Sequence, residues 1–416
     1  MSIIKENDIA VGYKHSALGV IPEEWEVKKL RSVCLGKGEY GINAAAVEYS
    51  ENLPAYIRIT DIDDEGRFCL DKKTSVNNAN ADNFLLQIND VVFVRTGATV
   101  GKSYLYNEND GKLVFAGFLI RFRIDVSVVN EYFLWSYTKS KPYWDWVKTT
   151  SMRSGQPGIN SLEYAALQIP YPKIQEQQAI ANCLSEWDKT IEKLNSLITQ
   201  KELRKKGLMQ GLLSGKKRLK GFENKWNYKS LQKFLIYTPR EVNKPIDLFL
   251  ALGLRSHGKG IFHKPNFDPK AIAMDKLYMV KENDLVVNIT FAWEQAIAIA
   301  TKADEGGLVS HRFPTYTFSE EASPLYFKFF ILGNRFKNML DLISPGGAGR
   351  NRVMSKKDFL KLEVFIPEKK EQEAIANVLE SIDKEIQLLK TKLDQMKLQK
   401  KGLMQVLLTG SKRLKY

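Results

Sequence analysis

Two stretches of the chain carry apolar residues at alternating steps of four and three, the spacing that forms the apolar seam of a helical coiled coil. The first has apolar positions at Ile180, Leu184, Trp187, Ile191, Leu194 and Ile198. The second has them at Ile375, Leu379, Ile382, Ile386, Leu389, Leu393 and Met396. Pro172 and Pro367 precede the two stretches, and Gly215 and Gly410 follow them, as expected at helix boundaries. The pattern predicts two long helices whose apolar residues form a helix–helix seam.

The two helical stretches are copies of one another. Residues 176–220 return as 371–415, displaced by 195 residues without a gap, and 26 of the 45 aligned positions are identical. A repeat of this length indicates two copies of one structural unit. Equal lengths and matching seams favour two helices that pack on each other. The alternative is that each helix packs against its own globular domain.

The segments before each helix resemble each other only weakly. Trp25-x4-Leu30 returns as Trp226-x4-Leu231, and Asn89–Val92 corresponds to Asn283–Val286. Runs such as Val91–Val94 and Leu119–Ile124 predict short strands. We therefore predict an α+β protein in which two pseudo-repeated α/β domains are separated by two long helices, packed as an antiparallel coiled coil. The predicted boundaries are 1–172 and 216–367 for the domains, and 173–215 and 368–416 for the helical segments.

Charge points toward a polyanionic partner. The 416 residues include 62 Lys and Arg against 48 Asp and Glu, which gives a net charge of +14. Nucleic acid is the usual partner of such a chain, although a lysine-rich surface alone would also explain the excess. Three cysteines without CxxC spacing, no signal peptide and no membrane-spanning apolar run lead us to expect a cytoplasmic protein.

The sequence contains no strong motif for catalysis, cofactor binding or metal binding. Gly97-Ala-Thr-Val-Gly-Lys-Ser103 is one residue short of a phosphate-binding loop, and its counterpart at 291–297 has no glycine. The acidic run 61–65 has the basic counterpart 255–259, and the four histidines share no spacing with Cys or Asp. We therefore expect no catalytic residue, no cofactor-binding residue and no metal site in this chain.

The helical motifs are similar to those of one known family. Three features resemble the specificity subunit of type I restriction-modification systems: Pro-Lys-Ile-Gln-Glu-Gln-Gln-Ala-Ile-Ala at 172–181, its copy Lys-Lys-Glu-Gln-Glu-Ala-Ile-Ala at 369–376, and both Lys-Gly-Leu-Met-Gln endings. The opening Gly-Val-Ile-Pro-Glu-Glu-Trp at 19–25 resembles that family's usual entry into a target recognition domain. The second entry, at 221–226, lacks the Ile-Pro.

This resemblance implies a function. Each domain would recognise one half of a bipartite, asymmetric sequence in double-stranded DNA. The helices would set the spacer and dock two methyltransferase subunits, which use S-adenosylmethionine to methylate adenine. Restriction subunits that use ATP and Mg²⁺ would complete an endonuclease. The chain itself would be non-catalytic.

Residue type and loop context suggest the DNA contacts, since Arg reads guanine and Asn or Gln reads adenine. The first group lies in polar, glycine-punctuated loops before each helix: Arg153, Gln156, Arg350, Asn351 and Arg352. The second group is Arg58, Arg95, Lys102, Arg255, His257 and Lys259. Basic residues near the helix ends, such as Lys205 and Lys400, could contact the DNA backbone or simply offset the helix dipole.

Two other functions stay open at this point. A structural adaptor that binds proteins through its domains would show no salt-dependent DNA binding. A free-standing DNA-modifying enzyme would methylate or cut DNA alone, although the sequence lacks the cofactor motifs that such an enzyme needs.

Overall fold

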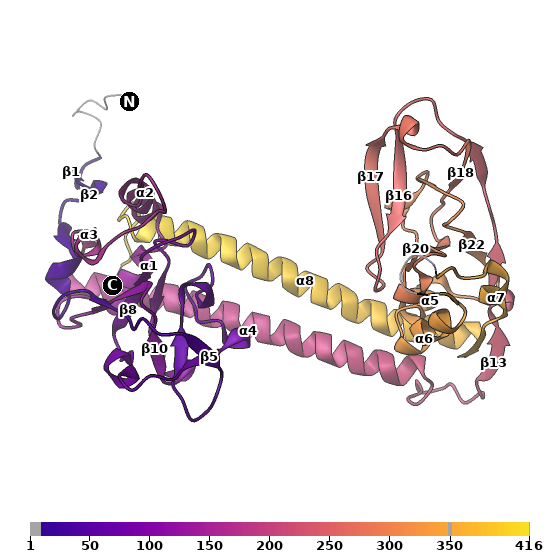
Figure 1. Ribbon diagram of the computed structural model, residues 1–416, viewed down its shortest axis with the longest axis horizontal. Coiled ribbons are helices and arrows are strands. Elements are labelled where there is room, and N and C mark those ends of the chain that lie inside the picture. Colours follow the sequence, from indigo (N-terminus) through magenta and orange to yellow (C-terminus); the bar gives the residue numbers. More distant parts are fainter. Residues whose placement is uncertain (1–9, 348–351, 416) are drawn as a thin grey trace. The chain divides into compact units, whose positions relative to one another are not determined.

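The computed structural model describes residues 10–347 and 352–415 (Figure 1). The chain divides into two compact units. Unit 1 comprises the chain up to Asn195 together with the segment from Lys392 onward, and unit 2 comprises Ser196–Thr391. Both divisions fall inside the long helices. Each unit therefore holds one globular domain and a part of each helix.

The two predicted long helices are present as α4, Ile174–Leu213, and α8, Lys369–Leu407. In unit 1, the first part of α4 packs against the last part of α8 (Figure 1). In unit 2, the last part of α4 packs against the first part of α8. The helices therefore pack together in opposite chain directions, which confirms the predicted fold class.

Burial follows the predicted seam in most positions. The buried seam residues are Ile180, Leu184, Ile191, Leu194, Ile198, Ile375, Leu379, Ile386 and Leu393. Trp187, Ile382 and Leu389 are only partly buried. Ile180 shares one core cluster with Trp25 of the first domain and Met404 of α8. The start of α4 thus packs on its domain and on the other helix at once, so the two alternatives drawn from the sequence are not exclusive.

Domain 1, the globular part of unit 1, is built from short strands and three helices. Its strands are β1 Tyr13–Ser16, β2 Gly19–Pro22, β3 Glu26–Lys29, β4 Glu39–Tyr40, β5 Ala46–Glu48, β6 Ala55–Ile57, β7 Thr74–Val76, β8 Asp90–Val94, β9 Ser103–Leu105, β10 Leu113–Phe115, β11 Leu119–Arg123 and β12 Gln168–Tyr171. Its helices are α1 Glu131–Tyr137, α2 Lys141–Thr150 and α3 Ser161–Ala165. The strands form sheets in the orders β10-β6-β7-β5 and β4-β11-β8-β9, with the pairs β12-β3 and β1-β2.

Domain 2, the globular part of unit 2, follows a related plan. Its strands are β13 Asn227–Ser230, β14 Leu235–Tyr237, β15 Glu241–Asn243, β16 Phe249–Leu254, β17 Ile261–Phe267, β18 Lys276–Met279, β19 Leu285–Val287, β20 Ile297–Ile299, β21 Leu308–Val309, β22 Thr315–Phe318 and β23 Glu363–Ile366. Its helices are α5 Pro324–Phe330, α6 Asn334–Leu342 and α7 Lys356–Lys361. The sheet orders are β14-β22-β19-β20, β15-β18-β21-β16-β17 and β13-β23.

The two domains share one sheet and differ in the other. The orders β4-β11-β8-β9 and β14-β22-β19-β20 have the same topology, and the predicted strands around Val91 and Leu119 form the paired strands β8 and β11. In domain 2, the long β16–β17 hairpin extends the second sheet (Figure 1). A common scaffold therefore carries different surfaces, as the weak repeat predicts.

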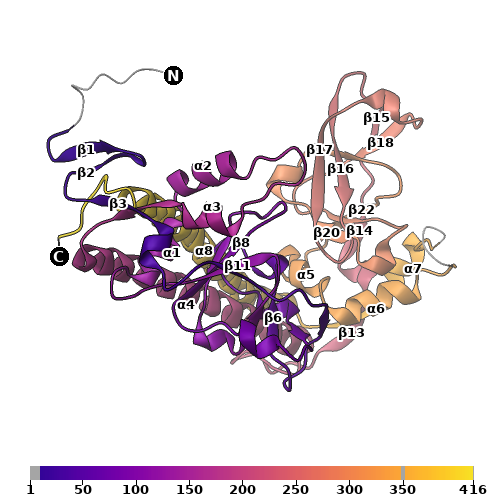
Figure 2. The same ribbon diagram turned by 60° about the vertical axis from the view of Figure 1, so that its left-hand side comes forward.

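The C-terminal segment returns to the start of domain 1 within unit 1 (Figure 2). The Tyr13 hydroxyl donates to the Gly410 carbonyl over 3.1 Å, and Arg413 lies 3.3 Å from the Glu24 carboxylate. Gly410 has φ +73°, and a Cβ there would stand 2.3 Å from Pro22. Only glycine permits this turn and this close approach. The tail therefore packs on the N-terminal strands of domain 1 within unit 1.

Candidate nucleic-acid interface

A buried carboxylate fixes the first turn of each long helix. In unit 1, Glu176 accepts a hydrogen bond from the Trp25 indole over 3.0 Å and pairs with Arg413. In unit 2, Glu371 accepts from the Trp226 indole over 3.0 Å and pairs with Arg218 at 2.6 Å. The hydrogen bonds to Glu176 raise the pKa of Arg413 above its usual value. Each carboxylate thus joins the start of one helix, the entry into a domain and the end of the other helix.

The next residue along each helix is a buried glutamine that has the same role in both units. The Gln177 side chain accepts from the Asn130 backbone N–H and donates to the Pro172 carbonyl, over 2.9 and 2.8 Å. Gln372 repeats both bonds with Ser323 and Pro367, each over 2.9 Å. The Glu-Gln pair of the sequence motif is therefore a mechanical tie between helix and domain.

Charged pairs across the helices also repeat. In unit 1, Asp188 of α4 contacts Lys400 of α8 over 2.5 Å. In unit 2, their counterparts Asp383 and Lys205 form the same pair. Burial favours a raised pKa for Asp188, but the charge and hydrogen bond of Lys400 outweigh burial and lower this pKa. From the sequence, Lys205 and Lys400 are interpreted as DNA-backbone contacts or as charges that offset the helix dipole. Neither interpretation includes this pairing, which occupies both ammonium groups within their units.

Two predicted DNA contacts come together on domain 1. The Gly97 N–H, in the loop after β8, donates to the Pro157 carbonyl over 3.1 Å. This bond brings the exposed Gln156 side chain beside the loop, with its nitrogen 3.3 Å from a Cβ position on Gly97. The Arg95 guanidinium lies 4.8 Å from the Tyr40 ring centroid and has no ion pair within residues 10–347 and 352–415. Arg95 and Gln156 therefore offer free hydrogen-bonding groups on one surface.

Arg58 and Lys102 are instead held by carboxylates. Arg58 donates to both oxygens of Asp61 over 2.8 and 2.9 Å, and these hydrogen bonds raise the pKa of Arg58. The Lys102 ammonium lies 2.7 Å from Asp64. These pairs occupy the charged groups, so neither side chain is free to read a base as it stands.

Arg153 is exposed but also engaged. Its guanidinium donates to Glu163 over 2.5 Å and to the Thr150 and Met152 carbonyls over 2.9 and 3.0 Å. Glu163 in turn belongs to the capping box of α3. The geometry therefore fixes the loop that carries Gln156 against the start of α3.

In domain 2, the loop before α7 is described only in part, because Arg350 and Asn351 lie outside the described residues. Arg352 donates to Asp341 over 2.6 Å and to the Ser344 carbonyl over 3.0 Å. Its guanidinium also lies 4.9 Å from the Trp293 ring centroid. These contacts brace the loop rather than leave Arg352 free.

The remaining candidates lie at the turn of the β16–β17 hairpin. His257 has φ +62°, and its N–H donates to the Glu294 carbonyl, which ties the turn to the loop after β19. The side chains of Arg255, His257 and Lys259 are exposed. The structure therefore presents three basic or titratable side chains at one turn.

Sequence reasoning missed Arg312. Its carbonyl accepts from the Ile289 N–H over 3.0 Å, just as the Phe118 carbonyl accepts from the Arg95 N–H in domain 1. Each domain therefore has an equivalent pair of bonded loops. In domain 1 the arginine lies on the loop after β8, whereas in domain 2 it lies on the loop before β22. Arg312 is exposed, and among the described residues its side chain donates only to the Thr290 hydroxyl, over a long 3.4 Å. An alignment of the two copies does not reveal Arg312, because it places Arg312 opposite an apolar residue.

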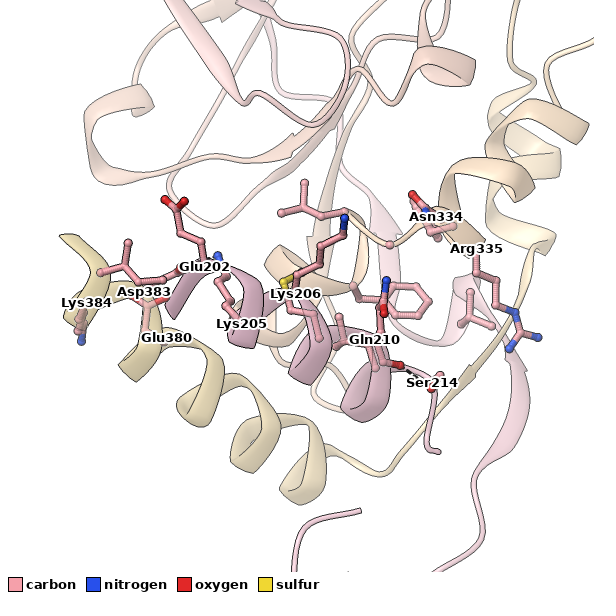
Figure 3. A pocket seen from close by; sticks show the side chains of 18 of the residues that line it. Glu202, Lys205, Lys206, Gln210, Ser214, Asn334, Arg335, Glu380, Asp383 and Lys384 are labelled. Atoms are coloured by element: carbon pink, nitrogen blue, oxygen red, sulfur yellow. Dashed lines mark hydrogen bonds and ion pairs between the residues drawn. The ribbon is translucent and has the colours of Figure 1, made fainter. Parts of the chain in front are cut away.

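A groove of about 890 Å³ lies in unit 2 between α4, α8 and the α5–α6 region (Figure 3). Apolar side chains line part of it, among them Met209, Phe330, Leu332, Phe336 and Met339. Charged side chains from both helices also line it, including the ion pair of Glu202 with Lys390 at 2.6 Å. Among the described residues, no group of His, Cys, Asp and Glu could hold a metal ion, and no helix is long and apolar enough to cross a membrane.

Comparison with known proteins gives the family. Residues 22–202 and 215–398 each match the type I restriction modification DNA specificity domain. The chain therefore belongs to the type I restriction-modification specificity family and carries its domain twice.

Curated relatives and solved structures agree. The chain is 24% identical to a protein of Methanocaldococcus jannaschii that bears the name of the MjaX type I restriction enzyme specificity subunit, over 97% of both chains. It is 23% identical to the MjaVIII specificity subunit of the same organism, over 95% of this chain and 94% of the relative. The fold is similar to the HsdS subunit from Thermoanaerobacter tengcongensis, with a TM-score of 0.52 and 15% identity over 94% of this chain and 98% of that one. The S subunit from M. genitalium gives a TM-score of 0.54 at 15% identity, over 92% and 96% of the two chains.

Proposed function

We propose that this protein is the DNA-specificity subunit of a type I restriction-modification complex, in which each domain reads one half of a bipartite, asymmetric DNA sequence. One observation carries the proposal: the same sheet occurs in both domains, but the loops at its end bear different side chains. A scaffold used twice with different loops suits the recognition of two different sequences.

We assign base contacts to the side chains whose donors are not consumed within the protein. In domain 1 these are Arg95 and Gln156, types suited to guanine and adenine, and in domain 2 we assign this role to Arg312 on the facing loop. Arg255, His257 and Lys259 would contact the backbone, where charge matters more than sequence. Arg58, Lys102, Arg153 and Arg352 would hold the loops in shape.

The reaction would belong to partner subunits. Methyltransferase subunits would bind S-adenosylmethionine and methylate adenine, and restriction subunits would use ATP and Mg²⁺. The groove in unit 2 is our candidate for docking a methyltransferase subunit, because it combines apolar floor residues with charged helix residues at its edge. A protein-binding adaptor without DNA affinity is not favoured, since both domains match a DNA specificity family.

Selection of bound duplexes from a random DNA pool tests the proposal. The purified complex should enrich a split motif, with binding that weakens steeply as salt rises because phosphate contacts release counterions. Arg95→Ala should relax one half of the motif and leave the other half intact. Lys148→Ala, at an exposed lysine of α2 outside the loops that carry Arg95 and Gln156, should change neither half of the motif. A pool without enrichment, or binding that is independent of salt, would contradict the proposal.

A further inference from the structure

Unit 1 contains a second cavity, of about 760 Å³, which the recognition of DNA does not explain. Its walls come from the turn at residues 63–67, the start of β9, the α1–α2 junction and the facing parts of α4 and α8. Six basic side chains line it: Arg67, Lys102, Lys139, Lys397, Lys400 and Lys401. Four acidic ones do so: Asp63, Asp64, Glu65 and Asp188. A volume of this size suits a small-molecule ligand.

Among the described residues, ion pairs leave three cavity lysines without a carboxylate partner: the half-buried Lys139 and the exposed Lys397 and Lys401. Asp188 pairs with Arg67 at 2.9 Å and with Lys400 at 2.5 Å. Lys139 forms no ion pair within the described part of the chain. Its ammonium lies 2.9 Å from the centroid of the Trp135 ring, and burial, followed by the nearby charge of Lys400, lowers its pKa well below the usual value. An ammonium in this setting would gain much from an anion beside it.

Comparison with unit 2 shows that this lysine is not needed to build the helix pair. Lys400, Asp188 and Met404 correspond to Lys205, Asp383 and Met209, which line the groove of unit 2. The residue that corresponds to Lys139 there is Leu332. This equivalence follows from the matching caps of α1 and α5, where Asn130 and Ser323 bond the equivalent glutamines Gln177 and Gln372. The same architecture therefore forms with a leucine at this position.

We propose that the cavity of unit 1 binds a phosphorylated small molecule of nucleotide size, with the Lys139 ammonium against its phosphate. Lys102 and Ser103, from the glycine-containing stretch 97–103, line the same cavity. That stretch joins two strands, so it does not form the strand–loop–helix phosphate site that its letters resemble. The bound phosphate would be held by side-chain cations rather than by a helix N-terminus.

Isothermal titration calorimetry on the full chain tests the proposal. The probes are inorganic phosphate, pyrophosphate and ATP, with adenosine as a ligand that lacks phosphate. We expect pyrophosphate and ATP to bind and adenosine not to bind. Lys139→Leu places at this position the residue that unit 2 already carries, and it should weaken binding about tenfold or more, the effect of losing a charge-assisted hydrogen bond. Lys139→Arg keeps the charge and should retain most of the affinity.

Two controls separate this site from DNA recognition. Lys148→Leu, at an exposed lysine outside the cavity, should bind pyrophosphate like the unaltered chain. Lys139→Leu should bind duplex DNA like the unaltered chain, and excess duplex should not displace pyrophosphate. The proposal is overturned if no phosphate ligand binds, if Lys139→Leu binds as tightly as the unaltered chain, or if duplex DNA competes for the same site.

Discussion

At the scale of single residues, the buried glutamates at the helix starts matter more than the exposed cations that the sequence draws attention to. Glu371 is 3% exposed and accepts from Trp226 and Arg218. The sequence does not reveal the common role of Glu176 and Glu371, because Glu-Gln is only a short motif there. The neighbouring Glu373 is exposed and serves as a matched control.

Glu371→Gln should destabilise unit 2. The change keeps an acceptor for the Trp226 indole but leaves the Arg218 guanidinium without its counter-charge, at a cost of about 2–4 kcal/mol. Urea unfolding followed by tryptophan fluorescence measures this cost. Glu373→Gln should stay within roughly 0.5 kcal/mol of the unaltered chain. An equal, small effect of both changes would refute the role of Glu371.

Lys139 should make stability depend on pH in a stated direction. Because its folded pKa lies below the usual 10.5, the unfolded chain binds more protons between these two values, and the free energy of unfolding rises with pH there. Lys139→Leu lacks this contribution, so its stability advantage should be largest below the folded pKa of Lys139 and should shrink as pH approaches 10.5. Thermal melting at several pH values, without phosphate, measures the difference. A difference that is constant with pH would contradict this explanation.

The candidate DNA-contact residues show what residue type can and cannot predict about where a side chain lies and what it bonds. The sequence identifies Arg95 and Gln156, and the structure brings them to one surface. It places Arg352, which the structure ties to Asp341, in the first group with Gln156 and above Arg95, and it omits Arg312. The carboxylates that occupy Arg153 and Arg352 lie 10 and 11 residues away in the sequence, so no local pattern reveals them, whereas Asp61 lies only three residues after Arg58.

At the scale of elements, the helix–helix contacts are the part that periodicity predicts best. The alternation of four and three steps depends only on helix geometry, and most seam residues are buried as expected. The sequence could not show that the two helices contact different surroundings in the two units. Asp188 also bonds Arg67 and Tyr132, which tie it to domain 1.

The two equivalent ion pairs should therefore differ in strength. A double-mutant cycle on Lys205 and Asp383 should give a coupling of about 0.2–1 kcal/mol, typical of a partly exposed pair. The cycle on Asp188 and Lys400 should give a larger coupling, because both side chains are at most 19% exposed and Asp188 belongs to a network. Alanine variants and urea unfolding supply the values. Equal couplings would mean that the contacts to domain 1 add nothing.

At the scale of the whole molecule, the repeat predicts the two-copy organisation. The segment after α8 supplies unit 1 with the contacts that the segment after α4 supplies to unit 2. Arg413 returns to Glu176 as Arg218 returns to Glu371, so unit 1 depends on the C-terminal segment. The recognition loops could not be predicted in this way, because the domains share only their scaffold and the loop residues differ between copies.

Deletion of the segment after Leu408 should destabilise unit 1 selectively. It removes Arg413, which pairs with the buried Glu176, and Gly410, which packs on Pro22. Hydrogen exchange should rise in β1–β3 and at the start of α4, while the start of α8 keeps its protection. Unchanged exchange throughout unit 1 would show that the tail is dispensable.

The most direct test of two-domain recognition is the methylome of cells that express this chain with its modification partners, compared with cells that carry Arg312→Ala or lack the gene. We predict a split, asymmetric methylated motif that disappears without the gene. In Arg312→Ala cells, only one half of this motif should change or relax. A continuous motif, simultaneous change of both halves, or methylation that persists without the gene would contradict the account.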